Sequence, residues 1–473
     1  MGKKMRMYVD IMACHPEVTG SCFLCVVKLP DRDTIKFIVD CGLFQEDKYH
    51  ELNDEFPFDC NDISFALITH NHVDHTGRLP MLVKEGFRGN FYTSKQTKVL
   101  LPLALSDSHK VLSELYKRKH KKMIYSESDV DKTLEHTVGI EYNKRLEIDP
   151  NIFVTFLPNA HLVGASMILI EVMYPDEEAI NILFTGDYNN KNEFIDVPPI
   201  PIEIREMRLN VITESTYGNT SITGIDFNIF RDKLLGAIVE EKTIVLPVFS
   251  LGRSQEILYE LKKFQQEGIL SKDIPIYFDG KLAHAYTKLY LECDELIKKS
   301  MKDFLPENVE FVNCEVRDNI LNSDSCKIIV TTSGMGTYGP AQIYIPYFIQ
   351  ENRSLILFTG FTPVGTLGDD LKNTEYGQHV KIGGMLKRRK ADVAYCTQFS
   401  AHAKQEDLLI LLKQFSNLRA VIINHGEEKV KEKYAEKVFD EVDASQVGVI
   451  NRDYLFRLGS FGIEKTLGTK FKI

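Results

Sequence analysis

The chain has 473 residues, more than one hydrophobic core usually serves, so we expect at least two domains. A hydrophobic content of 44% and a charged content of 26% are ordinary for a globular protein and exclude an intrinsically disordered chain. The net charge of −10 excludes a protein that coats nucleic acid over its whole surface, because such binding depends on Lys and Arg contacts to phosphate.

No segment predicts secretion or a membrane span. The start, residues 1–6, is basic, but no apolar signal segment follows, and no run approaches the roughly 20 apolar residues of a membrane helix. The nine cysteines are scattered and form no disulfide framework. The C-x-x-C of Cys22 and Cys25 lies in an apolar stretch where strand alternation puts the two sulfurs on opposite faces, so we interpret it as packing. We expect a soluble, cytoplasmic protein with no membrane partner.

The first informative element is a predicted strand at residues 63–68 that runs into the loop HNHVDH. Zinc ligands must converge at roughly 2.0 to 2.2 Å, which a tight loop at a strand end allows. His70 and His72 are predicted to serve one ion. Asp74 and His75 would serve a second ion about 3.5 to 4 Å from the first. Chance pairs of histidine are common in a chain with 13 of them, but H-x-H-x-D-H is far more restrictive than a pair.

A helical pattern occupies the region from about residue 95 to residue 140, within an otherwise strand-rich part of the chain. The basic run at residues 117–122 continues this pattern. A solvated helix face and a contact surface for RNA are equally consistent with the run.

Three later strands each deliver one further candidate ligand, with a glycine nearby that allows close approach of the backbone. They are residues 151–157 before His161, residues 182–185 before Asp187, and residues 420–423 before His425. Each is weak evidence alone, but together and in this order they supply the ligands that a metal pair still lacks.

Between these strands the pattern changes to strands that alternate with helices, which indicates an α/β domain with a mostly parallel sheet. The predicted strands are residues 243–249, 274–278 and 327–332. Because His425 must reach the same metals as His70, this segment has to be an insertion. We therefore predict a first domain that comprises residues 1–209 and 391–473, interrupted by an inserted domain at residues 210–390.

Together these motifs resemble the metallo-β-lactamase superfamily and, within it, the β-CASP nucleases. The resemblance extends over nearly the whole chain and is carried by TESTYG from Thr213, PVFSLGRSQE from Pro247, TSGMG from Thr332, FTG from Phe358, FSAHA from Phe399 and NHGE from Asn424. It implies an α/β fold in which a metallo-β-lactamase αββα sandwich is interrupted by a β-CASP domain, with the active site between the two.

The resemblance also implies roles for individual residues. His70, His72 and His161 would bind one zinc ion. Asp74, His75 and His425 would bind the other, and Asp187 would bridge both. Asp40 would orient the metal loop without binding metal. His402 would protonate the leaving 3′ oxygen, and Glu214 would hold the ring of His402 and favour its charged form.

The branch within the family indicates the substrate. The histidine at 425 is typical of members that process RNA, whereas those that process DNA carry valine there. The glycine loops resemble the branch that holds the nuclease subunit of the pre-mRNA 3′-end processing complex and its prokaryotic relatives. We therefore predict a zinc-dependent ribonuclease that cuts single-stranded RNA, with an endonuclease favoured and a role in RNA processing or decay.

Alternatives stay open. Ribonuclease J, a 5′–3′ exoribonuclease, shares the metal motifs but usually differs at the glycine loops and carries an extra C-terminal domain. A dimetal hydrolase of a small ester or thioester would not need Glu214 and His402. An inactive scaffold usually lacks metal ligands, and none is missing here. Manganese is the alternative to zinc, and a homodimer or a processing complex is compatible with the sequence.

Two glycine loops are candidates for contact with the RNA backbone. Gly252 and Arg253 begin a predicted helix, where free N–H groups and the helix dipole favour an anion. Ser333 and Gly334 are expected to form a similar nest of N–H groups. A turn that needs glycine explains each loop equally well. The basic run at residues 387–390, before the strand that leads to His402, favours RNA contact.

Overall fold

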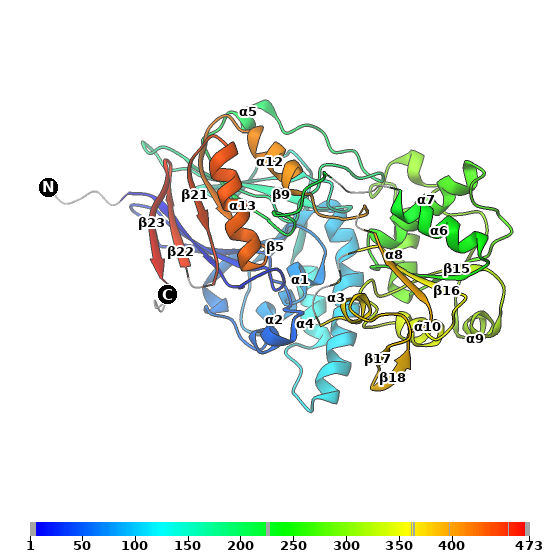
Figure 1. Ribbon diagram of the computed structural model, residues 1–473. Coiled ribbons are helices and arrows are strands. Elements are labelled where there is room, and N and C mark those ends of the chain that lie inside the picture. The colour runs from blue at the N-terminus through cyan, green and yellow to red at the C-terminus, as the bar shows by residue number, and fades with distance from the viewer. Residues whose placement is uncertain are drawn as a thin grey trace. The chain divides into compact units, whose positions relative to one another are not determined.

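The computed structural model describes residues 6–223, 228–360, 362, 365–396, 398–452 and 454–468 (Figure 1). The chain forms two compact units. The first contains Met1–Ile222 and His402–Ile473, and the second contains Thr223–Ala401. The sequence analysis places the inserted segment at residues 210–390.

The first unit is built on two large sheets. The eight-stranded sheet has the order β23 (Gly462–Gly468), β22 (Tyr454–Gly459), β1 (Tyr8–Ala13), β2 (Phe23–Lys28), β3 (Ile35–Val39), β4 (Ile63–Leu67), β5 (Asn90–Ser94) and β6 (Thr137–Ile140). The seven-stranded sheet has the order β21 (Ala444–Val449), β20 (Leu418–Ile423), β11 (Leu209–Thr213), β10 (Ile180–Phe184), β9 (Ser166–Val172), β8 (Ile152–Pro158) and β7 (Leu146–Asp149). The strands predicted beside the metal ligands are β4, β8, β10 and β20.

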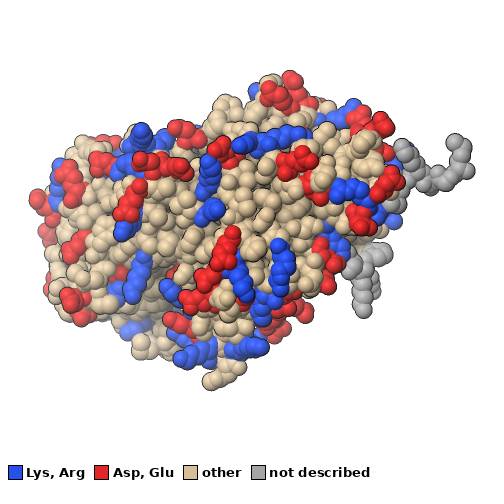
Figure 2. Space-filling model, turned by 180° about the vertical axis from the view of Figure 1, so that it is seen from behind, with Lys and Arg blue, Asp and Glu red and all other residues tan. Residues whose placement is uncertain are grey.

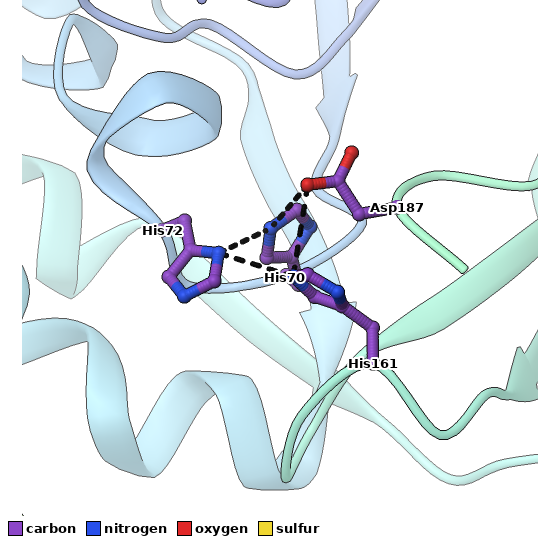
Figure 3. Close-up of side chains that lie close together, drawn as sticks. All are labelled: His70, His72, His161 and Asp187. Carbon is purple, nitrogen blue, oxygen red and sulfur yellow. Dashed lines mark hydrogen bonds and ion pairs between the residues drawn. The ribbon is translucent and has the colours of Figure 1, made fainter. Parts of the chain in front are cut away.

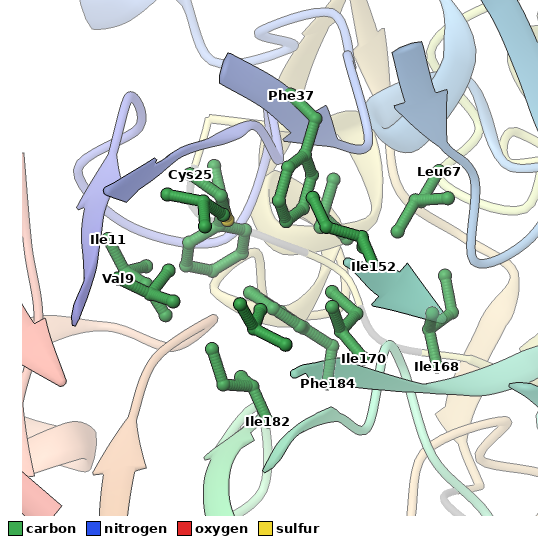
Figure 4. Packing of buried hydrophobic residues seen from close by; sticks show 14 of the residues in the cluster. Val9, Ile11, Cys25, Phe37, Leu67, Ile152, Ile168, Ile170, Ile182 and Phe184 are labelled. Atoms are coloured by element: carbon green, nitrogen blue, oxygen red, sulfur yellow. The ribbon is translucent and has the colours of Figure 1, made fainter. Parts of the chain in front are cut away.

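The two sheets face each other across one hydrophobic core. Val9 and Phe37 from the first sheet pack in the same cluster as Ile168 and Phe184 from the second (Figure 4). Because strand side chains alternate between faces, every second residue of these strands enters this core. The core fixes the ends of the strands, and therefore the loops that carry the predicted ligands.

Helices cover the outer faces of both sheets. The helices of this unit are α1 (Val73–Thr76), α2 (Leu79–Lys84), α3 (Lys95–Arg118), α4 (Glu127–Glu135), α5 (Ile202–Arg205), α12 (Gln405–Lys413) and α13 (Glu428–Glu441). Leu82 of α2 and Leu105 of α3 belong to a cluster on the outer face of the first sheet. Leu411 of α12 and Val438 of α13 belong to one on the outer face of the second sheet. The predicted αββα sandwich is therefore confirmed.

The C-x-x-C pair lies in this sandwich as predicted. Cys25 belongs to the core between the sheets, whereas Cys22 belongs to the cluster under the helices of the first sheet. Both are buried free thiols. The pair is therefore packing, with its sulfurs on opposite faces of the strand.

The second unit is an insertion between two neighbouring strands of the sandwich. Strands β11 and β20 are parallel partners in one sheet, although the whole second unit separates them in the sequence. Its six-stranded sheet has the order β14 (Val309–Phe311), β13 (Ile276–Asp279), β15 (Lys327–Thr331), β12 (Thr243–Pro247), β16 (Ser354–Phe358) and β19 (Asp392–Tyr395). All its strand pairs are parallel, so the predicted parallel α/β architecture is confirmed.

The second unit also contains α6 (Ile229–Val239), α7 (Arg253–Gln266), α8 (Lys281–Glu292), α9 (Cys314–Asn322), α10 (Ala341–Phe348), α11 (Leu367–Lys372) and the hairpin of β17 (His379–Ile382) and β18 (Met385–Arg388). Among the helices that the structure describes in either unit, none is long and apolar enough to span a membrane.

Candidate active site

The metal loop leaves the end of β4 and enters the short helix α1. Neighbouring backbone holds it tightly: the N–H of Cys41 donates to the carbonyl of His75 at 2.8 Å, and the N–H of Ser21 donates to the carbonyl of Asp74 at 2.8 Å. Gly42 lies so close to the loop that a Cβ atom there would be 1.5 Å from the carbonyl oxygen of Asp74. Only glycine allows this approach of the two segments.

Four predicted ligands form a first group of side chains, drawn in Figure 3. They are His70, His72, His161 and Asp187. The Nδ1 atom of His72 lies 3.1 Å from Nε2 of both His70 and His161. Burial lowers the pKa of His70 and of His72, so both imidazoles are neutral. Neutral imidazole is the form that binds a metal ion.

The remaining three predicted ligands, Asp74, His75 and His425, form a second group. His425 stands after the end of β20 with a φ of +46°. This left-handed conformation is uncommon for a residue other than glycine, and it persists only where the surrounding structure holds it.

Asp187 lies between the two groups. Its Oδ2 atom is 3.6 Å from Nε2 of both His70 and His161, in the first group. Its Oδ1 atom is 3.3 Å from Nε2 of both His75 and His425, in the second group. One carboxylate therefore directs a different oxygen at each set of imidazoles, as a bridging ligand would.

Several buried polar atoms in this region have no hydrogen-bond partner among the described residues. The Nε2 atoms of His75 and His425 and the Oδ1 atom of Asp187 are buried without a hydrogen bond to any described residue. They line a cavity of about 20 Å³. Nδ1 of His75 bonds to Asp40. In a neutral His75 the proton would therefore be on Nδ1, and the lone pair of Nε2 would point at Asp187. A cation between these atoms would satisfy all three, so the donor set fits divalent metal ions.

The pKa shifts of the site also fit a bound metal ion. Burial lowers the pKa of His75, but the carboxylates of Asp187 and Asp40 outweigh it and hold the pKa well above its usual value. Burial acts against the charge of Asp187, but the neighbouring histidines, led by His425 and His75, hold its pKa well below the usual value. The site therefore attracts positive charge, and a metal ion would replace the proton on His75.

Asp40 orients the loop without belonging to either group. Its Oδ2 atom accepts from Nδ1 of His75 at 2.7 Å, and its Oδ1 accepts from the backbone N–H of Thr69 at 2.8 Å. The hydroxyl of Thr69 also donates to Oδ2 at 2.8 Å and lies 3.0 Å from Nδ1 of His70. Thr69 was not predicted from the sequence, because a threonine at a strand end carries no signal of its own.

His402 and Glu214 form a pair beside the metal ligands. Nδ1 of His402 lies 2.9 Å from Oε2 of Glu214, and its Nε2 lies 3.8 Å from Oδ2 of Asp187. Burial opposes the charged form, but Glu214 and Asp187 outweigh it and raise the pKa of His402 to about 9. Glu214 is itself held by the backbone N–H groups of Tyr188 at 2.5 Å and Thr216 at 3.3 Å.

In the second unit, the glycine loops lie at the carboxyl ends of the parallel strands, the usual place for ligands in such sheets. Gly252 caps α7 with a φ of +80°. Arg253 is 6% exposed, and its Nε and Nη1 atoms have no hydrogen-bond partner among the described residues. Nη1 lies 3.2 Å from Oε2 of Glu256. The arginine is thus buried beside a helix N-terminus with donors to spare.

The second glycine loop, which holds Ser333 and Gly334, forms hydrogen bonds within itself. Ser333 donates its N–H to the carbonyl of Tyr338 at 3.2 Å, and its hydroxyl accepts from the N–H of Tyr338 at 3.2 Å. A Cβ atom on Gly334 would lie 2.9 Å from the ring of Phe249, so glycine is needed there for close packing. Phe249 follows β12, so this loop adjoins the segment that leads to Gly252.

The two basic runs of the sequence are both exposed in part. On the face shown in Figure 2, basic and acidic side chains are interspersed. Residues 117–122 are exposed at and beyond the end of α3, where Lys121 pairs with Asp54 at 3.1 Å. The register of the β17–β18 hairpin pairs His379 with Arg388 and Lys381 with Leu386. Its outward face therefore carries basic groups.

Comparisons with known proteins agree with this geometry. Residues 254–371 match the Beta-Casp domain, and residues 387–447 match the Zn-dependent metallo-hydrolase RNA specificity domain. The chain thus carries a Beta-Casp domain and resembles the β-CASP metallo-hydrolases. Residues 27–198, in the sandwich, match the family of the anti-Pycsar protein Apyc1.

Curated relatives are similar to this chain over most of its length. Transcription termination factor FttA of Methanosarcina mazei is 29% identical over 454 residues, or 90% of this chain and 68% of that protein. A ribonuclease of Thermus thermophilus is 27% identical over 424 residues, covering 87% of this chain and 91% of the relative. An RNase J-like protein of Methanocaldococcus jannaschii is 26% identical over 409 residues, covering 83% of this chain and 87% of that protein. The chain spans only about two thirds of the length of the FttA protein.

Proposed function

We propose that this protein is a ribonuclease that uses two divalent metal ions, preferably zinc, to hydrolyse phosphodiester bonds of single-stranded RNA. The observation that carries the proposal is the position of His402. Its Nε2 faces Asp187, between the two groups of ligands, while its Nδ1 is held by Glu214. A dinuclear ligand set supports hydrolysis, and a held imidazole beside it supports a leaving group that needs a proton.

Seven side chains would hold the two ions. His70, His72 and His161 would bind one ion, Asp74, His75 and His425 would bind the other, and Asp187 would bridge them. Bound there, divalent cations lower the pKa of water and offset the negative charge of a scissile phosphate. Imidazole and carboxylate ligands suit zinc, and manganese is the alternative.

His402 would act as the general acid. At neutral pH its raised pKa keeps the ring protonated, with the proton on Nε2 directed toward the metal ligands. Glu214, Asp187 and Asp74 all raise this pKa, and cations held by Asp187 and Asp74 would offset part of that attraction and bring the pKa nearer to neutrality, where a proton donor works best. Glu214 would fix the ring orientation and stabilise its charge.

RNA is supported as the substrate by three features. The last motif carries His425, the matched domain at residues 387–447 is described as an RNA specificity domain, and two relatives are named ribonuclease and RNase J-like. We favour an endonuclease, with a 5′–3′ exoribonuclease of the RNase J type as the alternative. A small ester or thioester substrate is the weaker alternative, because it would leave Glu214 and His402 without a role.

The RNA backbone would contact the second unit at two places. Arg253, with its spare donors, and the N-terminus of α7 at Gly252 would bind a phosphate. The loop of Ser333 and Gly334 would adjoin it.

The other place is the outward face of the β17–β18 hairpin, which exposes His379, Lys381 and Arg388. Arg388 also donates its Nε–H to the carbonyl of Gly377 at 3.1 Å. The opposite face buries Val380 and Ile382 in the core of the unit. The hairpin therefore holds exposed basic groups on a fixed scaffold, which suits a phosphate backbone.

One experiment separates these substrates. End-labelled single-stranded RNA, DNA of the same sequence and a thioester are incubated with metal-loaded protein, with and without chelator. We expect only RNA to be cut, and only without chelator. Intact RNA would refute the proposal. Products of 5′-triphosphorylated and 5′-monophosphorylated transcripts distinguish internal cutting from 5′ attack. Light scattering tests for a homodimer.

A further inference from the structure

The turn between β1 and β2, residues 14–22, contacts both chain segments that supply the second group of ligands. Near its end, the N–H of Ser21 donates to the carbonyl of Asp74 at 2.8 Å. At its start, His15 reaches Asn424, the residue that precedes His425. One turn therefore touches two ligand segments that lie far apart in the sequence.

His15 is completely buried and belongs to none of the motifs. Its Nδ1 atom lies 3.1 Å from the backbone nitrogen of Cys22 and 3.2 Å from the carbonyl oxygen of Cys22, and its Nε2 lies 2.9 Å from the side-chain amide of Asn424. Burial lowers its pKa, so the ring is neutral. A neutral ring bonds to Asn424 in either tautomer: Nε2 accepts from the amide N–H when the ring proton is on Nδ1, and donates to the amide oxygen when the proton is on Nε2.

The side-chain amide of Asn424 faces His15 with its Nδ2 atom, and its Oδ1 atom is buried without a hydrogen-bond partner among the described residues. With the ring proton on Nδ1, directed at the carbonyl of Cys22, the Nε2 atom of His15 accepts from this amide. The backbone of Asn424 is fixed separately, by its N–H to Thr213 at 2.9 Å and its carbonyl to the hydroxyl of Ser215 at 2.8 Å.

The ligand beside Asn424 needs such support. His425 has a left-handed backbone, and its Nε2 must meet Oδ1 of Asp187. The turn itself is anchored by buried Lys431 of α13, which donates to the carbonyl of Pro16 at 3.0 Å. Rotation of His425 away from Asp187 is therefore opposed through Asn424, His15 and the turn.

We propose that His15 is a positioning residue for the second metal ion: through Asn424 it holds His425 in place, while the other end of its turn holds Asp74. This inference rests on the proposed two-ion centre. The described hydrogen bonds of the turn to the ligand loops reach Asp74 and Asn424, in the segments that carry the second group, so the effect of His15 is directed at the second ion.

The test compares two substitutions of nearly equal size. In His15→Gln the side-chain amide reaches the place of Nε2 and still forms a hydrogen bond with Asn424. In His15→Asn the shorter amide accepts from the N–H of Cys22 but does not reach Asn424. Binding of Zn²⁺ alone is titrated against a competing chelator, and the metal-free proteins are unfolded thermally to compare their stability.

We expect wild type and His15→Gln to bind two ions. His15→Asn should bind the first ion normally and the second about 10- to 100-fold more weakly, the usual effect of losing a group that supports a ligand. Two ions bound by His15→Asn with wild-type affinity would overturn the inference, as would equal weakening of both steps or equal behaviour of the two variants. If wild type bound a single ion, the two-ion centre would be wrong. An unchanged zinc affinity of His15→Asn would then also refute the positioning role of His15.

Discussion

The Nδ1 atom of His402 lies 2.9 Å from Oε2 of Glu214, although the whole inserted unit separates the two residues in the sequence. Glu214 follows β11 and His402 precedes α12, which lie together in the sandwich. The pair forms because both residues belong to the sandwich, on the two segments of the chain that precede and follow the inserted unit.

Replacing His402 by alanine tests that donor. No atom of His402 belongs to either ligand group, so we expect His402→Ala to keep both metal ions. Cleavage should slow by about 10² to 10⁴, the usual contribution of a general acid. Zinc content and the rate of RNA cleavage are measured on the same preparation, and full activity would remove His402 from the mechanism.

Glu214→Gln should change the pH dependence of cleavage. Protonated His402 is the active form, so the rate falls as the pH rises through its pKa. The charge of Glu214 raises this pKa, and its removal lowers the pKa and moves the alkaline limb of the kcat profile to lower pH. Tyr434→Phe is the control, because the buried Tyr434 hydroxyl has no hydrogen-bond partner among the described residues. An unmoved limb in Glu214→Gln would contradict the assignment.

Asp187→Ala should reduce the binding of both ions and abolish detectable cleavage, because the two oxygens of Asp187 face different ligand groups. Asp74→Ala removes a ligand of the second group alone and should cost one ion. Metal per chain is measured after dialysis against trace zinc. A zinc content in Asp187→Ala equal to that of wild type would show that Asp187 is not a bridge.

Gly42→Ala should destabilise the metal loop. The added methyl would lie 1.5 Å from the carbonyl oxygen of Asp74, so one of the two backbones must move. We expect the free energy of unfolding to fall by about 1 to 3 kcal/mol or more. Gly236→Ala is the matched control, because no atom lies within 4 Å of a Cβ there, and in helix α6 alanine should stabilise by about 0.5 to 1 kcal/mol. Urea unfolding of the metal-free proteins gives both values, and equal stability of the two variants would refute the close approach.

Charge reversal on the β17–β18 hairpin tests RNA contact. Lys381→Glu with Arg388→Glu should weaken the binding of long single-stranded RNA and make it less dependent on salt, by about 0.7 in the log–log slope for each lost phosphate contact. Lys433→Glu with Lys465→Glu changes the same charge on exposed residues of α13 and β23. Filter binding at several salt concentrations measures both. An equal loss of RNA affinity in the two double variants would show that the change in net charge, and not a contact with the hairpin, weakens binding.

Much of the sandwich and its ligands was predictable from the sequence, because the signals are local. A strand alternates its side chains with a period of two, and a loop at its end must hold ligands within a few ångströms of one another, so HNHVDH after β4 is informative alone. His161, Asp187 and His425 follow the same rule at later strands. The parallel sheet of the second unit was likewise predictable from its alternating strands and helices.

Other features depend on how distant segments meet. The opposite directions of the two Asp187 oxygens, the approach of Gly42 to Asp74 and the bond between His15 and Asn424 leave no pattern in the sequence. His15 and Asn424 are 409 residues apart.

The sequence alone therefore determined which residues are candidate metal ligands and which family chemistry they suit, since ligand type and spacing are properties of short segments. The tertiary structure decided which of these candidates lie together in one group and what supports them. Burial between two packed sheets brings those segments together, and only there does a lone histidine or glycine acquire a role.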